Sequence, residues 1–261
     1  MAPRCSLLFV RRVGLSSMPG VHYSLLTTPY SFEETEMTQD EAKALVGRRA
    51  AEIVEDGMAV GLGTGTTSVM FIKALGERAR QGLKIRCVAS SDASAALGRS
   101  LGMDVVSLVE LPELDVYIDG ADEVGPGLSL IKGGGGALLR EKIVASSAKK
   151  FIVVADATKV VKVLGAFPLP IEVIKMALPL VEKKLKGMGL RPVQRLHKDG
   201  SVYLTDENNY ILDCGCGEIV NPAKTAEEIR GVVGVVEHGL FLGMASLALI
   251  AGDGGVTELR A

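Results

Sequence analysis

The side chains best suited to acid–base chemistry in this sequence lie in two short clusters. Asp119, Asp122 and Glu123 fall within DGADE, and Lys132 and Glu141 fall within KGGGGALLREK. Because grouped carboxylates repel one another, DGADE is either a solvated turn, a divalent metal site or a centre for proton transfer to sugar hydroxyls. A metal site would need further ligands at short spacing, and none is evident. We therefore expect no metal, and the solvated turn and proton transfer both stay open.

Histidine is too scarce here to be the expected acid–base group. The three histidines are His22, His197 and His238. Carboxylates or lysines must then carry proton transfer. We expect Glu141 in the second turn of a helix, on a face with Ala137 and Ala145, whose small side chains leave room for a ligand. The open alternative is an exposed glutamate paired with Lys142 or Arg140.

Two glycine-rich segments suit an anion. In GLGTGTTS (61–68), glycine amides and hydroxyl groups meet at a predicted helix N-terminus, which suits a phosphate, although a plain tight turn is the alternative. The segment lacks the endings of the nucleotide and dinucleotide motifs. The run KGGGG (132–136) lies between an apolar strand and an apolar helix, and we interpret it as a backbone nest. In SSDAS (90–94) we expect Asp92 to be a helix N-cap rather than a ligand contact.

The first half of the sequence alternates buried strands with helices. Helices are predicted from 38 to 57, 69–79, 93–101 and from the glycine run to 147, and strands at 58–63, from 85, at 103–106, 114–119 and 151–156. Such apolar runs predict a doubly wound, mostly parallel sheet of the α/β class. The four motifs follow strands, and open sheets of this kind bind ligands at the carboxyl ends of strands.

The pattern changes after residue 162. FPLPIEVIKMALP (167–179) has three prolines, which we interpret as a crossing between domains. Later strands are predicted at 192–196, 202–205, 210–214 and 232–237, a helix at 222–230, and a return of 240–251 to the first sheet. We therefore predict a larger domain of 37–164 plus 239–261, with a smaller α+β domain, 165–238, inserted before the C-terminal segment.

Composition excludes several classes of function. The net charge is −2, aromatic residues are 4% and tryptophan is absent, which argues against nucleic acid and anionic membranes as partners. The apolar stretch 240–252 is shorter than the ~20 residues that span a bilayer. Cys5, Cys87, Cys214 and Cys216 show no CxxC spacing, and we expect reduced thiols, with 214–216 alternating on a strand.

Residues 1–36 are predicted to be a leader or a disordered extension. Residues 1–32 contain no Asp or Glu but include Arg4, Arg11 and Arg12, a composition typical of transit peptides. The alternative is a true start at Met37. We expect a cytoplasmic protein, or a mitochondrial or plastid one if this segment targets it.

The motifs, in their order, resemble those of ribose-5-phosphate isomerases of the A type. The matching segments are MTQDEAK, GTGTTS, SSDAS, DGADE, KGGGGALLREKIVA, VVADATK and LGAFPLPIEVI. The resemblance extends from Met37 onward, and the KGGG block begins thirteen residues after Asp119 (132 − 119). It implies interconversion of D-ribose 5-phosphate and D-ribulose 5-phosphate through an enediolate in the non-oxidative pentose phosphate pathway, with no metal or cofactor, by a homodimer.

The resemblance also implies roles for individual residues. Glu141 would move a proton between C1 and C2, Asp119 and Asp122 would serve ring opening and hydroxyl proton transfer, and Lys132 would stabilise the enediolate oxygen. The residues implied in substrate binding are Lys43, Thr64, Gly65, Thr66, Thr67, Gly120, Ala121, Gly133, Gly134, Gly135 and Lys159. Departures from the family pattern are Thr66 for Ser, Gly136 for Ala and Leu139 for Thr.

Two other functions compete with this interpretation. A sugar-phosphate-sensing domain would bind the ligand without turnover, but it should carry a DNA-binding helix-turn-helix, and the segment before Met37 has no helical periodicity. A nucleotide-binding oxidoreductase would need the dinucleotide glycine fingerprint, which is missing. The pKa of Glu141 is left open, because Lys132 should lower it and exclusion of water should raise it.

Overall fold

A seven-stranded sheet forms the centre of the N-terminal half in the computed structural model, which describes residues 37–261. In sheet order its strands are β14 (Gly255–Arg260), β13 (Leu247–Gly252), β7 (Phe151–Asp156), β4 (Val116–Gly120), β1 (Ala59–Leu62), β2 (Arg86–Ala89) and β3 (Asp104–Val105). All neighbours are parallel except β13 and β14. Every residue of β7 is buried, as expected for a strand covered on both faces.

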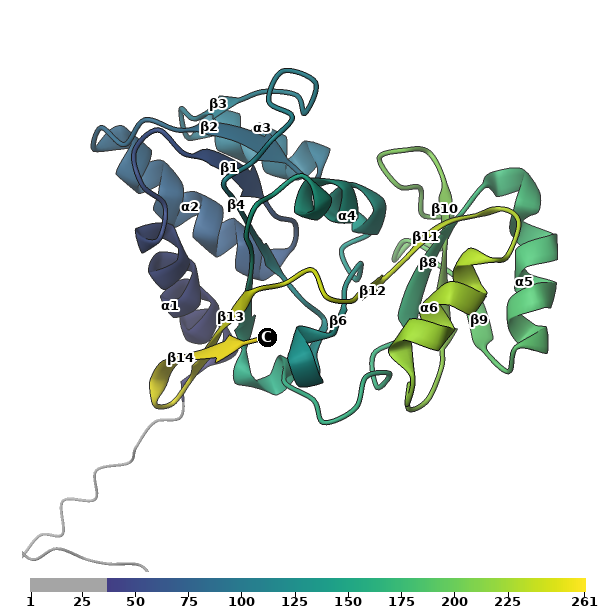
Figure 1. Ribbon diagram of the computed structural model, residues 1–261. Helices are drawn as coiled ribbons and strands as arrows, with labels where there is room; N and C mark the ends of the chain where they lie inside the picture. Colours follow the sequence, from purple (N-terminus) through teal and green to yellow (C-terminus); the bar gives the residue numbers. More distant parts are fainter. Residues whose placement is uncertain (1–36) are drawn as a thin grey trace, which may run out of the picture. The chain divides into compact units, whose positions relative to one another are not determined.

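Helices cover both faces of this sheet, which confirms the doubly wound α/β prediction (Figure 1). The helices are α1 (Gln39–Glu52), α2 (Thr66–Arg80), α3 (Asp92–Ser100) and α4 (Leu138–Ser146). Val46, Phe71 and Leu75 from α1 and α2 belong to a core on one face. Val144 of α4 packs with Tyr117 in a separate core on the other face. The predicted cap of the first helix is present, since Thr38 and Glu41 form a reciprocal capping box.

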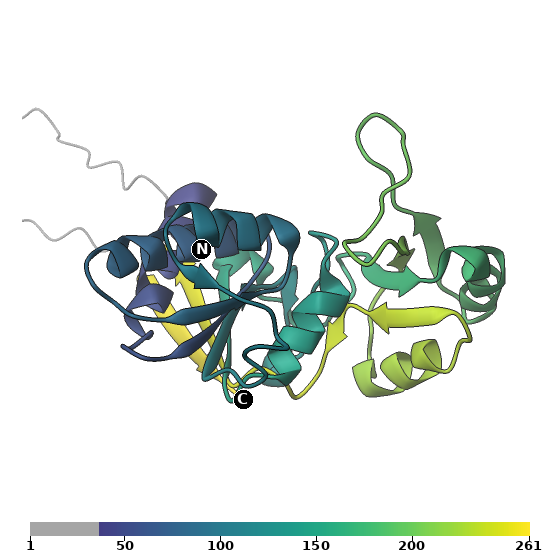
Figure 2. The same cartoon turned by 90° about the horizontal axis from the view of Figure 1, so that it is seen from above.

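A second, antiparallel sheet lies beside α4 (Figures 1 and 2). Its strands, in order, are β11 (Val235–His238), β8 (Leu169–Val173), β10 (Tyr210–Gly215) and β9 (Arg191–Gln194), and the associated helices are α5 (Leu178–Gly187) and α6 (Pro222–Arg230). Ile171, Val181, Leu212 and Ile229 share a core of their own. The domain boundaries proposed from the sequence stay a prediction.

Short elements connect the two sheets. These are β5 (Glu123–Val124), β6 (Leu130–Ile131) and β12 (Leu240–Phe241), which form a three-stranded sheet, and the 3-10 turns η1 (Pro126–Leu128) and η2 (Ala157–Lys159). A third 3-10 turn, η3 (Lys175–Ala177), joins β8 to α5. After β12 the chain returns to the large sheet as β13, as the sequence predicted. The carbonyl of Gly239, just before β12, accepts from the amide of Lys132 at 2.9 Å.

The region after residue 162 departs most from the sequence prediction. The proline-rich segment contains a regular strand that was not predicted, because β8 passes through it with Pro170 paired opposite Asp213. The missing proline donor is tolerated, while the Pro170 carbonyl still accepts from Gly239 at 2.8 Å. Residues 202–205 form no strand, only a bridge between Leu196 and Val202. Helix α5 and the hairpin of β13 with β14 were not predicted.

The order of the strands determines where a ligand can bind. From β1 the chain runs outward through β2 and β3, and then returns to the other side of β1 as β4. The gap between β1 and β4 at their carboxyl ends is therefore the switch point at which open α/β sheets bind ligands. The Gly/Thr segment (residues 61–68) lies at the carboxyl end of β1, and DGADE lies at the carboxyl end of β4.

Candidate active site

One pocket collects the predicted residues at the carboxyl ends of β1, β4 and β7. It is lined by Gln39, Lys43, Thr64, Gly65, Thr66, Thr67, Gly120, Ala121, Asp122, Lys132, Gly133, Gly134, Gly135, Glu141, Asp156 and Lys159. Of the catalytic and substrate-binding residues predicted from the sequence, only Asp119 does not line the pocket; it lies behind Lys132 with no exposed surface. Leu139, a departure from the family pattern, does not line the pocket either.

Glu141 and Lys132 form a buried ion pair at the floor of the pocket. Oε2 of Glu141 lies 3.2 Å from Nζ of Lys132, and both side chains are at most 3% exposed. This Oε2 makes no hydrogen bond within residues 37–261. The exposed pairing of Glu141 with Lys142 or Arg140 is therefore wrong. Because α4 begins at Leu138, Glu141 lies in its first turn and not in the second.

Burial determines the protonation of this pair. It raises the pKa of Glu141 to about 8, against the opposing charge of Lys132 and with the help of Asp119. The sequence left open whether Lys132 lowers the pKa of Glu141 or exclusion of water raises it, and exclusion of water has the larger effect. Burial alone would lower the pKa of Lys132, but the charges of Asp119 and Glu141 outweigh it, so this pKa is raised and Lys132 stays cationic.

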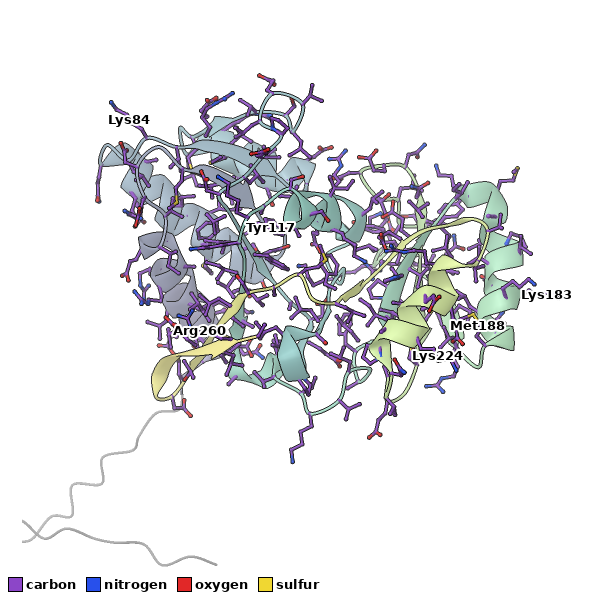
Figure 3. The ribbon with its side chains drawn as sticks, in the orientation of Figure 1. Lys84, Tyr117, Lys183, Met188, Lys224 and Arg260 are labelled. Carbon is purple, nitrogen blue, oxygen red and sulfur yellow. The ribbon has the colours of Figure 1, made fainter. Side chains whose placement is uncertain are left out.

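Asp119 is fully occupied by donors from the protein. Its Oδ1 accepts from the amides of Thr64 and Gly120 at 2.8 and 2.7 Å and from Ser68 Oγ at 2.7 Å. Its Oδ2 accepts from Lys132 Nζ at 2.7 Å and from the Tyr117 hydroxyl. Tyr117 lies on β4 in the large sheet, and its side chain is buried (Figure 3). In this arrangement Asp119 holds the ammonium group of Lys132, which also donates to the Gly120 carbonyl at 2.6 Å.

Asp122 faces the glycine run (residues 133–136). Its Oδ2 accepts from the amide of Gly134 at 2.8 Å, and a Cβ at Gly134 would lie only 2.5 Å from Oδ1, so this approach requires glycine. Burial raises the pKa of Asp122, opposed by the Gly134 amide and by Lys132. Asp122 can therefore hold a proton at a higher pH than an exposed aspartate.

The other end of the pocket is suited to a dianion. Helix α2 begins at Thr66 with no side-chain cap. Its first amides, including those of Thr66 and Thr67, make no hydrogen bond within residues 37–261 and lie at the positive end of the helix dipole. Lys43 and Lys159 add two cationic side chains to the lining. The hydroxyl of Thr64 is hydrogen-bonded to the hydroxyl of Ser90 at 2.8 Å, so this side chain joins two loops of the protein.

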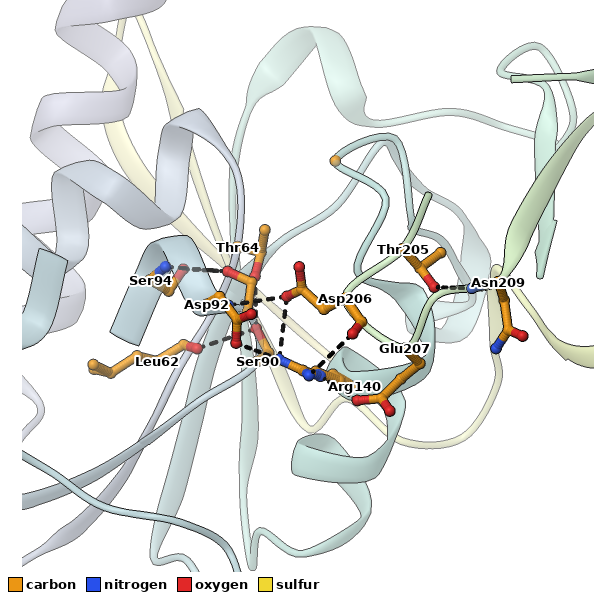
Figure 4. A network of polar contacts seen from close by, with 12 residues as sticks. Leu62, Thr64, Ser90, Asp92, Ser94, Arg140, Thr205, Asp206, Glu207 and Asn209 are labelled. Atoms are coloured by element: carbon orange, nitrogen blue, oxygen red, sulfur yellow. Dashed lines mark hydrogen bonds and ion pairs between the residues drawn. The ribbon is translucent and has the colours of Figure 1, made fainter. Parts of the chain in front are cut away.

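Arg140, beside Glu141 in the sequence, links three parts of the chain (Figure 4). Its Nη1 lies 2.7 Å from Asp92 and 3.2 Å from Asp206, and its Nε lies 2.6 Å from Glu207. The prediction of Asp92 as an N-cap is wrong: Ser91 caps α3 by accepting from Ser94, and Asp92 begins the helix. Its carboxylate is free to pair with Arg140.

Some polar residues at the site were missed in the sequence. Asp156 ends β7 with Oδ2 buried and without a hydrogen-bond partner in the described part of the chain, and Gln39 lies nearby in the lining. Tyr117 stands two residues before Asp119, so the two-residue period of a strand places both on one face of β4. That period, and a polar residue ending a buried strand, were the available signals for Tyr117 and Asp156.

Three further findings concern metal ligands, cysteines and membrane spans. Among residues 37–261, no group of three His, Cys, Asp or Glu side chains is arranged to hold a metal ion. In the same part of the chain Cys87, Cys214 and Cys216 are free thiols, as expected; Cys5 lies outside it. No described helix is long and apolar enough to cross a membrane.

The comparisons with known proteins agree with one another. The family model for ribose 5-phosphate isomerase A (phosphoriboisomerase A) matches residues 86–255. Ribose-5-phosphate isomerase A of Synechococcus sp. is 49% identical over 224 residues, which cover 85% of this chain and 97% of the relative. The solved structure of ribose 5-phosphate isomerase A from Methanocaldococcus jannaschii has a TM-score of 0.82 at 37% identity, covering 86% of this chain and 100% of that one. The solved structure of a D-ribose-5-phosphate isomerase in complex with phospho-erythronic acid has a TM-score of 0.84 at 35% identity. The match covers 86% of this chain and 100% of that one.

Proposed function

The chain belongs to the ribose 5-phosphate isomerase A family and interconverts D-ribose 5-phosphate and D-ribulose 5-phosphate; we propose that Glu141 carries the proton between C1 and C2. The observation that supports this role is the buried carboxylate of Glu141 in the pocket lining, where Oε2 lies 3.2 Å from Lys132 Nζ and makes no hydrogen bond with the described residues. A base is most effective when its pKa is near the working pH, and burial raises the pKa of Glu141 to about 8.

The carbon acid is activated by the groups around its carbonyl oxygen. When Glu141 removes the proton from C2 of the open-chain aldose, negative charge develops on the oxygen at C1. Lys132 and the amides of the glycine run are the donors available for that oxygen, and each such donor is worth roughly 10²–10³ in rate. A proton then passes from the hydroxyl group at C2 to the oxygen at C1, and return of the proton from Glu141 to C1 gives the ketose. The reverse reaction uses the same groups.

Asp122 is proposed to serve ring opening and the transfer of hydroxyl protons. Burial raises its pKa, so the side chain can alternate between donor and acceptor at a sugar hydroxyl. The same role predicted for Asp119 stays a prediction. Its five protein donors support a different contribution, which is to hold the ammonium group of Lys132 toward the pocket.

The phosphate is proposed to bind at the N-terminus of α2. The amides of Thr66 and Thr67, with Lys43 and Lys159, supply positive potential there, while Glu141 lies in the lining on α4. Binding the phosphate and reacting at C1 and C2 then rely on separate groups. Variant Lys43→Ala, which removes an ammonium group, should mainly raise KM; Thr67→Ala should do so only as far as the lost hydroxyl group binds the phosphate, because the amide is retained.

Two further proposals concern the assembly and the location of the protein. We propose a homodimer, because β9 is an edge strand and Val193, Leu196, Val202 and Leu204 on or near it are exposed. A monomer by light scattering would contradict it.

We also propose cytoplasmic residence, with the mitochondrion or plastid as the alternative if residues 1–36 act as a transit peptide. Those residues lie outside the described part, and sequencing the N-terminus of the cellular protein decides between the two.

The direct test is turnover of ribose 5-phosphate in the presence of EDTA. Wild type should form ribulose 5-phosphate with the chelator present, whereas Glu141→Gln should bind substrate without turnover. The matched control is Glu172→Gln, since Glu172 is equally buried but is bonded to Thr205 and Asn209 in the smaller sheet. Wild-type binding without turnover would instead favour the sugar-phosphate-sensing domain.

A further inference from the structure

A side chain from the smaller sheet contacts the backbone of the glycine run. Nη1 of Arg195 donates to the carbonyl of Gly133 at 2.9 Å and to the carbonyl of Gly134 at 3.2 Å. The other edge of the guanidinium faces Asp213 on β10, with Nε 2.8 Å from Oδ2 and Nη2 bonded to Oδ1. Arg195 is 13% exposed, so this pairing is largely shielded from water.

These contacts, together with the amide of Gly136, which donates to the Gly133 carbonyl at 2.9 Å, orient two peptide groups. In a trans peptide the carbonyl of one residue and the amide of the next point in opposite directions. With the Gly133 carbonyl on Arg195, the Gly134 amide points away and meets Asp122 at 2.8 Å. With the Gly134 carbonyl on Arg195, the Gly135 amide also points away, and it has no acceptor in the described residues. Gly135 lines the pocket.

We propose that Arg195 is a positioning residue for the isomerisation. By binding the two carbonyls it keeps the amide of Gly134 on Asp122 and leaves the amide of Gly135 available to the oxygen that becomes negative in the enediolate. The inference rests on the proposed function, because it assumes that this pocket performs the isomerisation. It assigns to the smaller sheet a part in the chemistry of the larger one.

The glycine run needs such a contact because its peptides have no side chains to resist rotation. A rotated peptide would present a carbonyl dipole to the developing negative charge in place of an amide. Donors stabilise a transition state only when they are oriented in advance. A planar guanidinium can bind a carboxylate with one edge and two carbonyls with another, which an ammonium group cannot do. Lysine is therefore a poor substitute here.

Tyr203 strengthens the same contact from the loop after β9. Its ring centroid lies 5.7 Å from the Arg195 guanidinium carbon, and its hydroxyl lies 3.4 Å from the carbonyl of Gly135. A Cβ at Gly136 would overlap this hydroxyl, and φ at Gly136 is +84°. The departure from the family pattern at Gly136 thus has a physical reason in this chain, since Tyr203 occupies the space that an alanine would need.

The test compares Arg195→Ala and Arg195→Lys with wild type and with the control Arg191→Ala, an exposed arginine on the same segment. The measurements are kcat and KM for ribose 5-phosphate and the dissociation constant of phospho-erythronic acid. The carboxylate of this acid resembles the planar, anionic enediolate. Arg195→Ala should lower kcat by about 10²-fold, the effect of one preoriented donor, and weaken phospho-erythronic acid similarly. KM should change by less than about threefold.

Arg195→Lys should recover little of this loss, and Arg191→Ala should match wild type. Wild-type kcat in a folded Arg195→Ala, or a loss confined to KM, would overturn the inference. If Arg195→Ala does not fold, Asp213→Asn decides: it keeps the arginine but weakens its orientation, and unchanged kcat there would also overturn it. Failure of wild type to isomerise ribose 5-phosphate would instead refute the proposed function.

Discussion

Replacing Glu141 with glutamine should change how the stability of the protein depends on pH. The pKa of Glu141 is 4.5 when unfolded and about 8 when folded. Since the folded pKa is the higher one, the stabilising contribution is complete below about pH 4.5 and is lost as pH rises toward 8. At roughly 1.4 kcal/mol per pH unit, the interval of about 3.5 units sets a ceiling on the order of 5 kcal/mol. Glutamine stays neutral and avoids this loss.

The expected result is that Glu141→Gln becomes more stable than wild type as the pH rises. Urea unfolding followed by far-ultraviolet circular dichroism at about pH 5, 7 and 9 measures it, and the absence of tryptophan favours this probe. Contributions from the other titrating groups largely cancel between the two proteins. The advantage of the variant should be small near pH 5 and largest near pH 9.

Glu237→Gln is the matched control because its pKa moves the other way. Burial would raise the pKa of Glu237, but pairing with Lys142 at 2.9 Å outweighs this and lowers it. Its stabilising contribution is therefore present above pH 4.5 and lost as pH falls, so the variant should be less stable than wild type at pH 7 and 9. A difference between Glu141→Gln and wild type that is constant from pH 5 to 9 would refute the reasoning about burial.

Three further substitutions test other parts of the site. Lys159→Ala should raise KM for ribose 5-phosphate about tenfold or more and leave kcat within about threefold, and initial rates showing the reverse would contradict the phosphate assignment. Gly136→Ala should lower the free energy of unfolding by roughly 2–4 kcal/mol through positive φ and overlap with Tyr203; adding Tyr203→Ala should recover part of it in urea titrations. Tyr117→Phe removes a buried donor to Asp119 and should cost about 1–3 kcal/mol by the same method; no change would show that the bond is not needed.

The pocket could largely be predicted because most of its residues come directly after the carboxyl ends of strands. Parallel strands bring their carboxyl ends to one edge of the sheet, so motifs far apart in the sequence meet without any knowledge of side-chain packing. That argument places Thr64, Asp122 and Glu141 together. It does not say which carboxylate faces the ligand. Residues of a strand alternate between its two faces, so Asp119 lies on the same face of β4 as Tyr117. There it is bonded to the Tyr117 hydroxyl and lies behind Lys132.

The residues that the sequence did not reveal act across long separations. Arg195 is 62 residues from Gly133, and nothing in either segment indicates the contact. The region after 162 was also harder, because prolines usually exclude a central strand. Pro170 is accommodated in β8 since its carbonyl, and not its nitrogen, makes the bond to Gly239. The edge and register of that sheet depend on packing between segments.

The most direct test of the central role of Glu141 is isomerisation in deuterium oxide, followed by proton NMR. A carboxylate that carries the proton between C1 and C2 exchanges it with solvent, so wild type should place deuterium on carbon in ribulose 5-phosphate. Glu141→Gln should incorporate none while still binding phospho-erythronic acid. Incorporation by Glu141→Gln at the wild-type rate would contradict the account, as would wild-type turnover that leaves the carbon-bound hydrogen entirely unexchanged.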